Sequence, residues 1–165
     1  MDSDQRGEIV DPTQLLQRSV DLAREKMLAG EGGPFGAVIA RQGEIIAEGW
    51  NRVTSANDPT AHAEIMAIRL ACEKLGSFSL AGCEIYASCE PCPMCLAAIY
   101  WARLERVTFA ATREQAARVG FDDARLYREL RLPLELREVA MAHLSLPAAD
   151  AVFELWENKT DKIPY

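Results

Sequence analysis

The sequence predicts an α/β fold in which helices cover both faces of a central sheet, a three-layer αβα sandwich. The chain has 165 residues and is 49% hydrophobic, so it is long and apolar enough for one domain with a sizeable core. Runs with β-strand character alternate along it with runs of helical periodicity. No repeat, low-complexity tract or Pro/Ser-rich linker interrupts it, and we expect a single domain over residues 1–165.

The N-terminal part of the chain predicts a helix followed by a β-hairpin. Apolar residues recur at helical spacing over residues 12–30, and Asp11 is suited to cap the helix. Residues 35–50 hold two β-rich runs on either side of Gln42-Gly43, a pair suited to a tight turn. We therefore expect one helix and two paired strands before the first polar loop.

The rest of the chain predicts further alternation of helices and strands. One helix is indicated by apolar residues that lie near one face, among them Ile65, Ile68 and Ala71. In chain order we expect a polar loop (51–58), a helix from about 59 to 75, a strand (83–88), a helix from about 91 to 102, a strand (106–111), a helical or irregular stretch (113–131), a strand near 136–142 and a last helix (149–157).

The charge balance narrows the class of partner. The chain has 18 Lys plus Arg against 25 Asp plus Glu, a net charge of −7, so a polyanion such as RNA would be repelled at long range and we expect a small-molecule partner. No stretch approaches the roughly 18 apolar residues that would span a bilayer, and the N-terminus is unlike a secretory signal. We therefore expect a cytosolic protein whose five cysteines are reduced thiols, some of them metal ligands.

Two short motifs carry the strongest chemical signal, "HAE" at residues 62–64 and "CEPCPMC" at residues 89–95. Cys92 and Cys95 are three apart, so on a helix they share a face and can hold one metal ion. His62 would add a third ligand, which leaves the fourth position of a tetrahedral zinc ion open to water, as in catalytic sites. We expect one zinc ion per chain, bound by His62, Cys92 and Cys95.

Both motifs are expected near helix N-termini. Pro91 fits the first turn of one helix, and Asp58 or Thr60 can cap the other, with Pro59 in its first turn. The partial positive charge at a helix N-terminus lowers the pKa of a thiol toward the thiolate that a metal needs. The metal site is therefore predicted where two helices begin.

Glu64 is the expected general base. Two thiolates cancel the double charge of a zinc ion, so its water should be less acidic than in a site with three histidines, and a carboxylate is needed to take the proton. Residues two apart on a helix point about 200° away from each other. His62 and Glu64 would therefore approach one site from different sides of the first turn, His62 toward the metal and Glu64 toward the water.

Cys89 leaves a different interpretation open. Together with Cys92 and Cys95 it forms C-x-x-C-x-x-C, which is compatible with a closed structural zinc site or with part of an iron–sulfur run. Pro91 favours an extended residue before it, which would leave Cys89 at the end of the preceding strand and off the shared face. Two further cysteines, Cys72 and Cys83, are expected in the core.

The motifs match H-x-E…P-C-x-x-C, the signature of zinc-dependent base deaminases. The chain therefore resembles the cytidine deaminase superfamily. Residues 49–69 are similar both to tRNA adenosine deaminases and to bacterial guanine deaminases of this fold. The stretches "GGPFGAVI" (32–39), "SCEPCPMCLAAIYWAR" (88–103) and "GFDD" (120–123), and the final "PY", favour the guanine deaminase branch.

The resemblance implies a zinc hydrolase with a mixed five-stranded sheet that converts guanine to xanthine and ammonia. It also implies a homodimer in which the C-terminal segment, about residues 145–165, is exchanged between subunits and closes the partner's site. A tRNA adenosine deaminase, or a deaminase of another small aminated heterocycle such as cytosine, remains the alternative.

The same resemblance implies roles for individual residues. Asp123 would meet the guanine edge that bears the 2-amino group and help Glu64 move protons. His62 would lie against the base as well as bind zinc. The remaining contacts implied are a hydrogen bond from Asn51 to the base, walls formed by Phe35, Trp101 and Phe121, and a cover formed by Tyr165.

Overall fold

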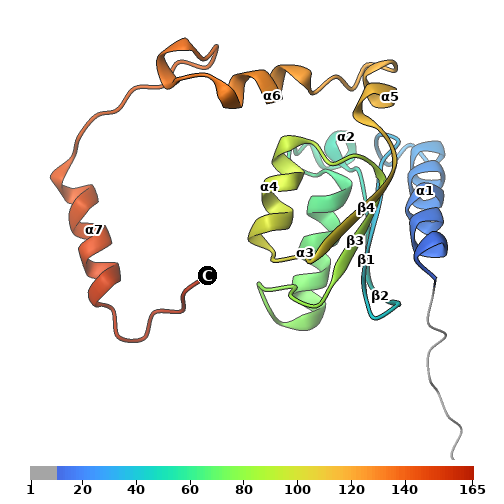
Figure 1. Ribbon diagram of the computed structural model, residues 1–165, viewed down its shortest axis with the longest axis horizontal. Coiled ribbons are helices and arrows are strands. Elements are labelled where there is room, and N and C mark those ends of the chain that lie inside the picture. The colour runs from blue at the N-terminus through green and yellow to red at the C-terminus, as the bar shows by residue number, and fades with distance from the viewer. Residues whose placement is uncertain (1–10) are drawn as a thin grey trace, which may run out of the picture. The chain divides into compact units, whose positions relative to one another are not determined.

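The computed structural model describes residues 11–165 and falls into two compact units, one ending at Asp123 and one spanning Ala124–Tyr165. The first unit contains a sheet with helices on both of its faces (Figure 1). The second contains only helical and irregular segments. The extent of the predicted single domain, 1–165, stays a prediction, and its N-terminal decapeptide lies outside the described residues.

The first unit is built on a four-stranded sheet. Its strands are β1 (Gly36–Arg41), β2 (Glu44–Trp50), β3 (Glu84–Cys89) and β4 (Arg106–Ala111), in the order β2-β1-β3-β4. β1 pairs antiparallel with β2 and β3, whereas β3 pairs parallel with β4. The sheet is therefore mixed, as the resemblance implies, but the described chain has four strands where five were expected.

Helices cover the sheet on both faces, which confirms the predicted three layers. α1 (Pro12–Leu28) lies on one face, and α3 (Ala63–Leu75) and α4 (Pro93–Trp101) lie on the other (Figure 1). Side chains of β1 alternate between the two faces, because successive residues of a strand point in opposite directions. Val38 and Ala40 pack in the core under α1, and Ala37 and Ile39 pack in the core under α3 and α4.

The predicted N-terminal helix and hairpin are confirmed. Asp11 caps α1 with a capping box, in which its carboxylate accepts from Thr13 and the Gln14 side chain accepts from the Asp11 N–H at 3.0 Å. Gln42 and Gly43 both have positive φ, 52° and 81°, as a tight hairpin turn of the type I′ class requires. The polar loop that follows contains one short helix, α2 (Val53–Ala56).

The two helices at the predicted metal site begin later than expected. α3 begins at Ala63, about four residues after the predicted start at Pro59, because Asp58 forms a local turn instead of a helix cap. Its carboxylate accepts from the Thr60 N–H at 2.8 Å and from the Thr60 hydroxyl at 2.7 Å. α4 begins at Pro93 rather than near Pro91, and Pro93 occupies the first helical turn.

The second unit contains α6 (Ala124–Arg131), a 3₁₀ turn (Leu134–Leu136) and α7 (Pro147–Asn158), and α5 (Arg113–Ala117) precedes it in the first unit. The last predicted helix is confirmed in α7. The strand predicted near 136–142 is wrong. A short apolar run does not make a strand without a partner for its backbone, and here local bonds replace a ladder: Arg137 donates to the Leu132 carbonyl and the Glu138 N–H donates to the Glu129 carboxylate.

Within residues 11–165, no helix has the length and apolar character needed to cross a membrane.

Two glycines allow helices of the first unit to pack close to the sheet. A Cβ on Gly49 would lie 2.4 Å from the Ala63 carbonyl oxygen, and a Cβ on Gly36 would lie 2.2 Å from the Ser19 carbonyl oxygen. Gly49 therefore sets how closely the first turn of α3 approaches β2, and Gly36 does the same for α1.

We predict that Gly49→Ala and Gly36→Ala each lower the free energy of unfolding by about 1–3 kcal/mol, because the added methyl group overpacks a tight contact. Chemical denaturation measures the loss. Amide exchange should separate the two variants: the first turn of α3 should exchange faster in Gly49→Ala than in Gly36→Ala. Equal exchange in both would contradict the role assigned to Gly49.

Candidate metal centre

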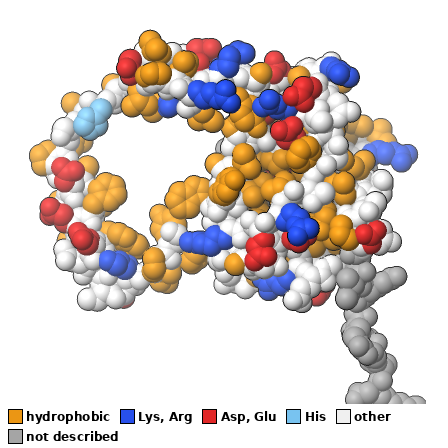
Figure 2. Space-filling view, viewed as in Figure 1, with side chains coloured by type: hydrophobic (Ala, Val, Ile, Leu, Met, Phe, Trp, Pro, Cys, Tyr) orange, Lys and Arg blue, Asp and Glu red, His pale blue; other side chains and the backbone are white. Residues whose placement is uncertain are grey.

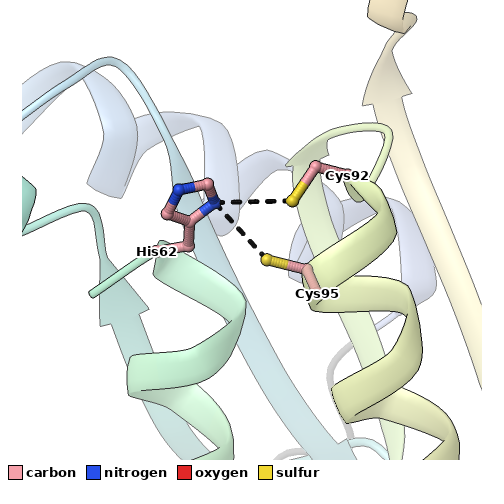
Figure 3. A group of neighbouring side chains, drawn as sticks. All are labelled: His62, Cys92 and Cys95. Carbon is pink, nitrogen blue, oxygen red and sulfur yellow. Dashed lines mark hydrogen bonds between the residues drawn. The ribbon is translucent and has the colours of Figure 1, made fainter. Parts of the chain in front are cut away.

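The described chain brings together the three predicted metal ligands. His62 is the N-cap of α3, Cys92 is the N-cap of α4, and Cys95 lies in the first turn of α4. His62 Nδ1 lies 3.6 Å from the Cys92 sulfur and 3.5 Å from the Cys95 sulfur (Figure 3). Their three ligand atoms all lie within 4.8 Å of one another. Among the His, Cys, Asp and Glu side chains of residues 11–165, these three form the group that could hold a metal ion.

The separations between these atoms fit a zinc ion. Tetrahedral zinc with bonds of about 2.3 Å to sulfur and about 2.0 Å to nitrogen sets nitrogen and sulfur ligands about 3.5 Å apart. The distances of 3.6 and 3.5 Å from His62 Nδ1 to the two sulfurs match this value. One imidazole and two thiols therefore surround a point at zinc-bonding distance and leave a fourth direction open.

The local backbone explains why these side chains can reach a metal. His62 and Cys92 have extended backbones, with ψ of 156° and 168°, and neither side chain caps its own helix. Each N-cap side chain is therefore available to a ligand, and the partial positive charge of both helix ends meets there.

The two thiols differ in their protonation. The pKa of Cys92 is lowered to about 4, chiefly by hydrogen bonding with the Cys95 side chain. The pKa of Cys95 is raised, first by that same hydrogen bond to Cys92 and then by burial. A thiolate is thus in place at Cys92, and a metal ion that binds there has to displace the proton of Cys95.

Glu64 lies beside the ligands as predicted. It is the second residue of α3, its side chain is 8% exposed, and the Cys95 sulfur lies 3.4 Å from its Oε2 atom. Burial raises the pKa of the Glu64 carboxyl above its ordinary value. A buried carboxylate with a raised pKa next to an open ligand position has the properties of a general base.

Cys89 stays outside this group. It ends β3, and its sulfur lies 3.7 Å from the Thr112 carbonyl oxygen. Burial raises the pKa of its thiol to about 11, so it remains protonated. The geometry therefore favours the open site with three ligands over a closed site that includes Cys89.

Three of the predicted substrate-binding residues lie on segments next to one another. The ring of Phe35 meets that of Phe121 edge to face, with centroids 4.8 Å apart. Asp123 is half-buried, and its pKa is raised by burial and by the negative charge of Cys92, which indicates that it lies near the ligands. Their contacts with a substrate stay predictions.

Two other predicted residues lie elsewhere. Trp101 is the last residue of α4, at the opposite end of that helix from Cys92, and its side chain is 67% exposed. Tyr165 belongs to the second unit. Their roles at the site also stay predictions.

Asn51 is held in place by backbone N–H groups on two sides, one of them from the glycine loop before Pro34. The sequence motifs did not predict this contact. The Asn51 Oδ1 atom accepts from the Gly33 N–H at 3.1 Å and from the Val53 N–H at 3.3 Å. Gly32 passes so close that a Cβ there would lie 1.8 Å from the Asn51 carbonyl oxygen. The paired glycines before Pro34 are the sequence signal of this contact, since only glycine allows such an approach.

Comparisons with known proteins agree with this geometry. The family model described as the cytidine and deoxycytidylate deaminase zinc-binding region matches residues 10–111. Guanine deaminase from Bacillus subtilis (strain 168) is 52% identical over 150 residues, which cover 91% of this chain and 96% of that protein. The X-ray structure of guanine deaminase from Bacillus subtilis superposes with a TM-score of 0.92 at 50% identity, over 94% of this chain and 99% of that one.

More distant relatives share parts of the chain. A structure of guanine deaminase from Nitrosomonas europaea has a TM-score of 0.67 at 33% identity and covers 73% of this chain and 69% of that one. The tRNA-specific adenosine deaminase of Aquifex aeolicus is 48% identical over 90 residues, which cover 53% of this chain and 60% of that protein. Similarity to the adenosine deaminase is therefore confined to a smaller part of the chain.

The site predicts how cysteine variants affect metal content. Cys92→Ala and Cys95→Ala should each lower bound zinc below one ion per chain, because two protein ligands hold zinc poorly. Cys89→Ala, the matched control, should keep its zinc. Metal analysis of protein purified without chelator measures both. Full zinc content in Cys92→Ala or in Cys95→Ala, or loss of zinc from Cys89→Ala, would contradict the ligand set.

Proposed function

The chain belongs to the cytidine and deoxycytidylate deaminase family, and from this we propose that it is a cytoplasmic zinc enzyme that hydrolyses guanine to xanthine and ammonia. The observation that carries the proposal is the placement of Glu64. Its buried carboxylate lies 3.4 Å from a thiol of the metal site, where a general base for water has to be. The similarity to guanine deaminases over nearly the whole chain supports guanine as the base.

The proposed chemistry follows from the groups at the site. A zinc ion bound by His62, Cys92 and Cys95 would supply a water molecule of lowered pKa as the nucleophile. Glu64 would take one proton from the water and deliver it to N3 of guanine as the water oxygen bonds to C2. Glu64 would then take the second proton from that oxygen and pass it, with help from Asp123, to the 2-amino group, so that a C2=O group forms as the C2–N bond breaks and ammonia leaves. Burial raises the pKa of Glu64 toward neutral pH. A carboxyl group with such a pKa can both accept and donate a proton at little cost in free energy, as the two steps require.

Asn51 is proposed to fix the orientation of the base. Its Oδ1 atom is occupied by two backbone N–H groups, of Gly33 and Val53. Only a carbonyl oxygen can accept from those donors, so the amide nitrogen is the atom left to face a ligand. Asn51 therefore presents a donor, which suits an acceptor atom on the purine ring rather than its amino group.

The aromatic residues are proposed to hold the flat faces and edges of the base. The edge-to-face pair of Phe35 and Phe121 supports a wall built from two distant segments of the first unit. Asp123 follows Phe121 closely and would meet the edge that bears the 2-amino group. Trp101 and Tyr165 are proposed to complete the enclosure, as the resemblance implies.

The charge distribution gives no support to tRNA as substrate. In residues 124–165 acidic residues outnumber basic ones, seven to six. The two lysines of the tail are both engaged locally: Lys159 with the Asp161 carboxylate and Lys162 with the Glu157 carbonyl oxygen. Binding of a phosphate backbone needs a cluster of available cations, so a small neutral base is the better match.

We further propose a homodimer in which the C-terminal segment closes the partner's site. None of the residues in the second unit is buried, although many are large and apolar. Hydrophobic side chains are exposed along its helices (Figure 2). A segment with this much exposed apolar surface and no core of its own needs a surface to cover it, and a second copy of the chain is the commonest partner.

The role of Glu64 predicts a specific loss. Glu64→Ala should lower kcat for guanine by about 10²–10⁴ while zinc content stays at that of the unmodified protein, because the carboxylate moves protons and does not bind the metal. Conversion of guanine to xanthine is followed by absorbance. Glu73→Ala, at an exposed position of the same helix, is the control and should be unaffected. Near-normal turnover by Glu64→Ala would end this account.

Tail exchange predicts complementation between two inactive chains. A Glu64→Ala chain with an intact tail is mixed, by unfolding and refolding together, with a chain that keeps Glu64 and lacks residues 163–165. In a mixed dimer the intact tail would close the one site that has Glu64, so activity should return. Each chain refolded alone is the control. Failure of the mixture to regain activity, although mixed dimers form, would show that the tail does not serve the partner.

A further inference from the structure

Glu90 joins the metal-binding loop to a segment far along the chain. The Glu90 N–H donates to the Ala111 carbonyl oxygen at 2.9 Å, and the Glu90 carboxylate accepts from the Arg113 N–H at 3.1 Å. Its neighbour Cys89 makes a third contact, from its thiol to the Thr112 carbonyl oxygen at 3.7 Å. The two residues before Pro91 are thus hydrogen-bonded to the end of β4 and the start of α5.

The Glu90 carboxylate accepts a hydrogen bond from the first turn of α5. Thr112 and Gln115 form a capping box at that turn, in which each side chain accepts the other's backbone N–H. The Arg113 N–H belongs to the first residue of α5, and first-turn N–H groups are bonded by acceptors other than the carbonyl groups of the helix itself. Glu90 is the acceptor for it, and its negative charge strengthens the bond.

α5 leads directly to two of the residues assigned to substrate. The Phe121 N–H donates to the Ala116 carbonyl oxygen at 3.1 Å, so Phe121 is tied to the end of α5. Its ring lies against Phe35, and Asp123 follows two residues later. Burial and then the negative charge of Cys92 raise the pKa of Asp123, whereas the positive charge of Arg113 lowers it.

We propose that Glu90 is a positioning residue: by accepting the Arg113 N–H it fixes α5, and with it Phe121 and Asp123, in place relative to the two metal-binding thiols. The inference rests on the proposed function, because that function gives Phe121 and Asp123 their contacts with the base. Glu90 itself touches neither substrate nor metal in this assignment. It sets the distance between the place where water is activated and the place where the base is held.

The chain offers a matched pair of variants on each side of the bond. Glu90→Ala removes the acceptor, whereas Glu90→Gln keeps a carbonyl oxygen at the same length without the charge. Arg113→Pro removes the N–H donor, whereas Arg113→Ala keeps it. Proline is tolerated as the first residue of a helix, and Thr112 before it already has the extended backbone that proline requires, with φ −87° and ψ 162°.

Loss of either partner should lower kcat/KM for guanine by about tenfold to a hundredfold, as expected when a group that orients the site is removed. The double variant Glu90→Ala/Arg113→Pro should be no worse than either single variant, because both remove the same bond. Zinc content should stay at one ion per chain in all variants. Glu90→Gln should stay within about threefold of the unmodified protein. Arg113→Ala is the reference for Arg113→Pro, because both variants lack the guanidinium whose charge acts on Asp123 and only Arg113→Pro lacks the N–H donor.

Amide exchange provides a readout that needs no substrate. Residues 113–123 should exchange faster in Glu90→Ala and Arg113→Pro than in Glu90→Gln and Arg113→Ala. Additive losses in the double variant, unchanged exchange in residues 113–123, or equal damage from Glu90→Ala and Glu90→Gln would each overturn the proposal. If the unmodified protein does not deaminate guanine, the proposed function fails, and amide exchange still decides whether Glu90 holds this segment.

Discussion

The site depends on one constraint: α3 and α4 have to begin beside each other, each with a metal ligand as its capping residue. His62 and Cys92 are these capping residues, and neither side chain forms a hydrogen bond that caps its own helix. Gly49 allows the first turn of α3 to lie close against β2, which keeps His62 within 3.6 Å of the thiols. A metal ion bound there would coordinate the imidazole and the two thiols that the two helix N-termini bring together in a partly buried site.

The division of labour within "HAE" follows from the same constraint. Since His62 is extended and Ala63 is the first helical residue, Glu64 falls in the first turn with its carboxylate buried beside Cys95. Burial raises its pKa, and the open side of the ligand triad is where a water molecule would lie. The first turn of α3 thus places the proposed general base beside the metal ligands, two of which come from α4.

Much of this was predictable from local sequence, and the errors have physical causes. The ligand triad, Glu64, the hairpin and the three layers follow from spacing and periodicity. The start of α3 did not, because the turn that Asp58 makes with Thr60 competes with helix capping and is invisible to periodicity. The start of α4 is also later than predicted, because Pro93 favours an extended backbone at Cys92. The strand predicted near 136–142 is wrong because a short apolar run does not supply the neighbouring strand that a backbone needs for pairing. The bond between Glu90 and Arg113 joins residues distant in sequence, which no local pattern reveals.

The proposed function is deamination of guanine, as a free base, at this metal site with its buried glutamate. Ammonia release by the zinc-loaded protein tests it across guanine, guanosine, adenine, cytosine, cytidine and adenosine in tRNA. We expect the highest kcat/KM for guanine and a much lower value for guanosine, because the enclosure assigned to Phe121 and Tyr165 leaves no exit for a ribose. A preference for any nucleoside over its free base, or inosine formation in tRNA with no reaction of guanine, would contradict it.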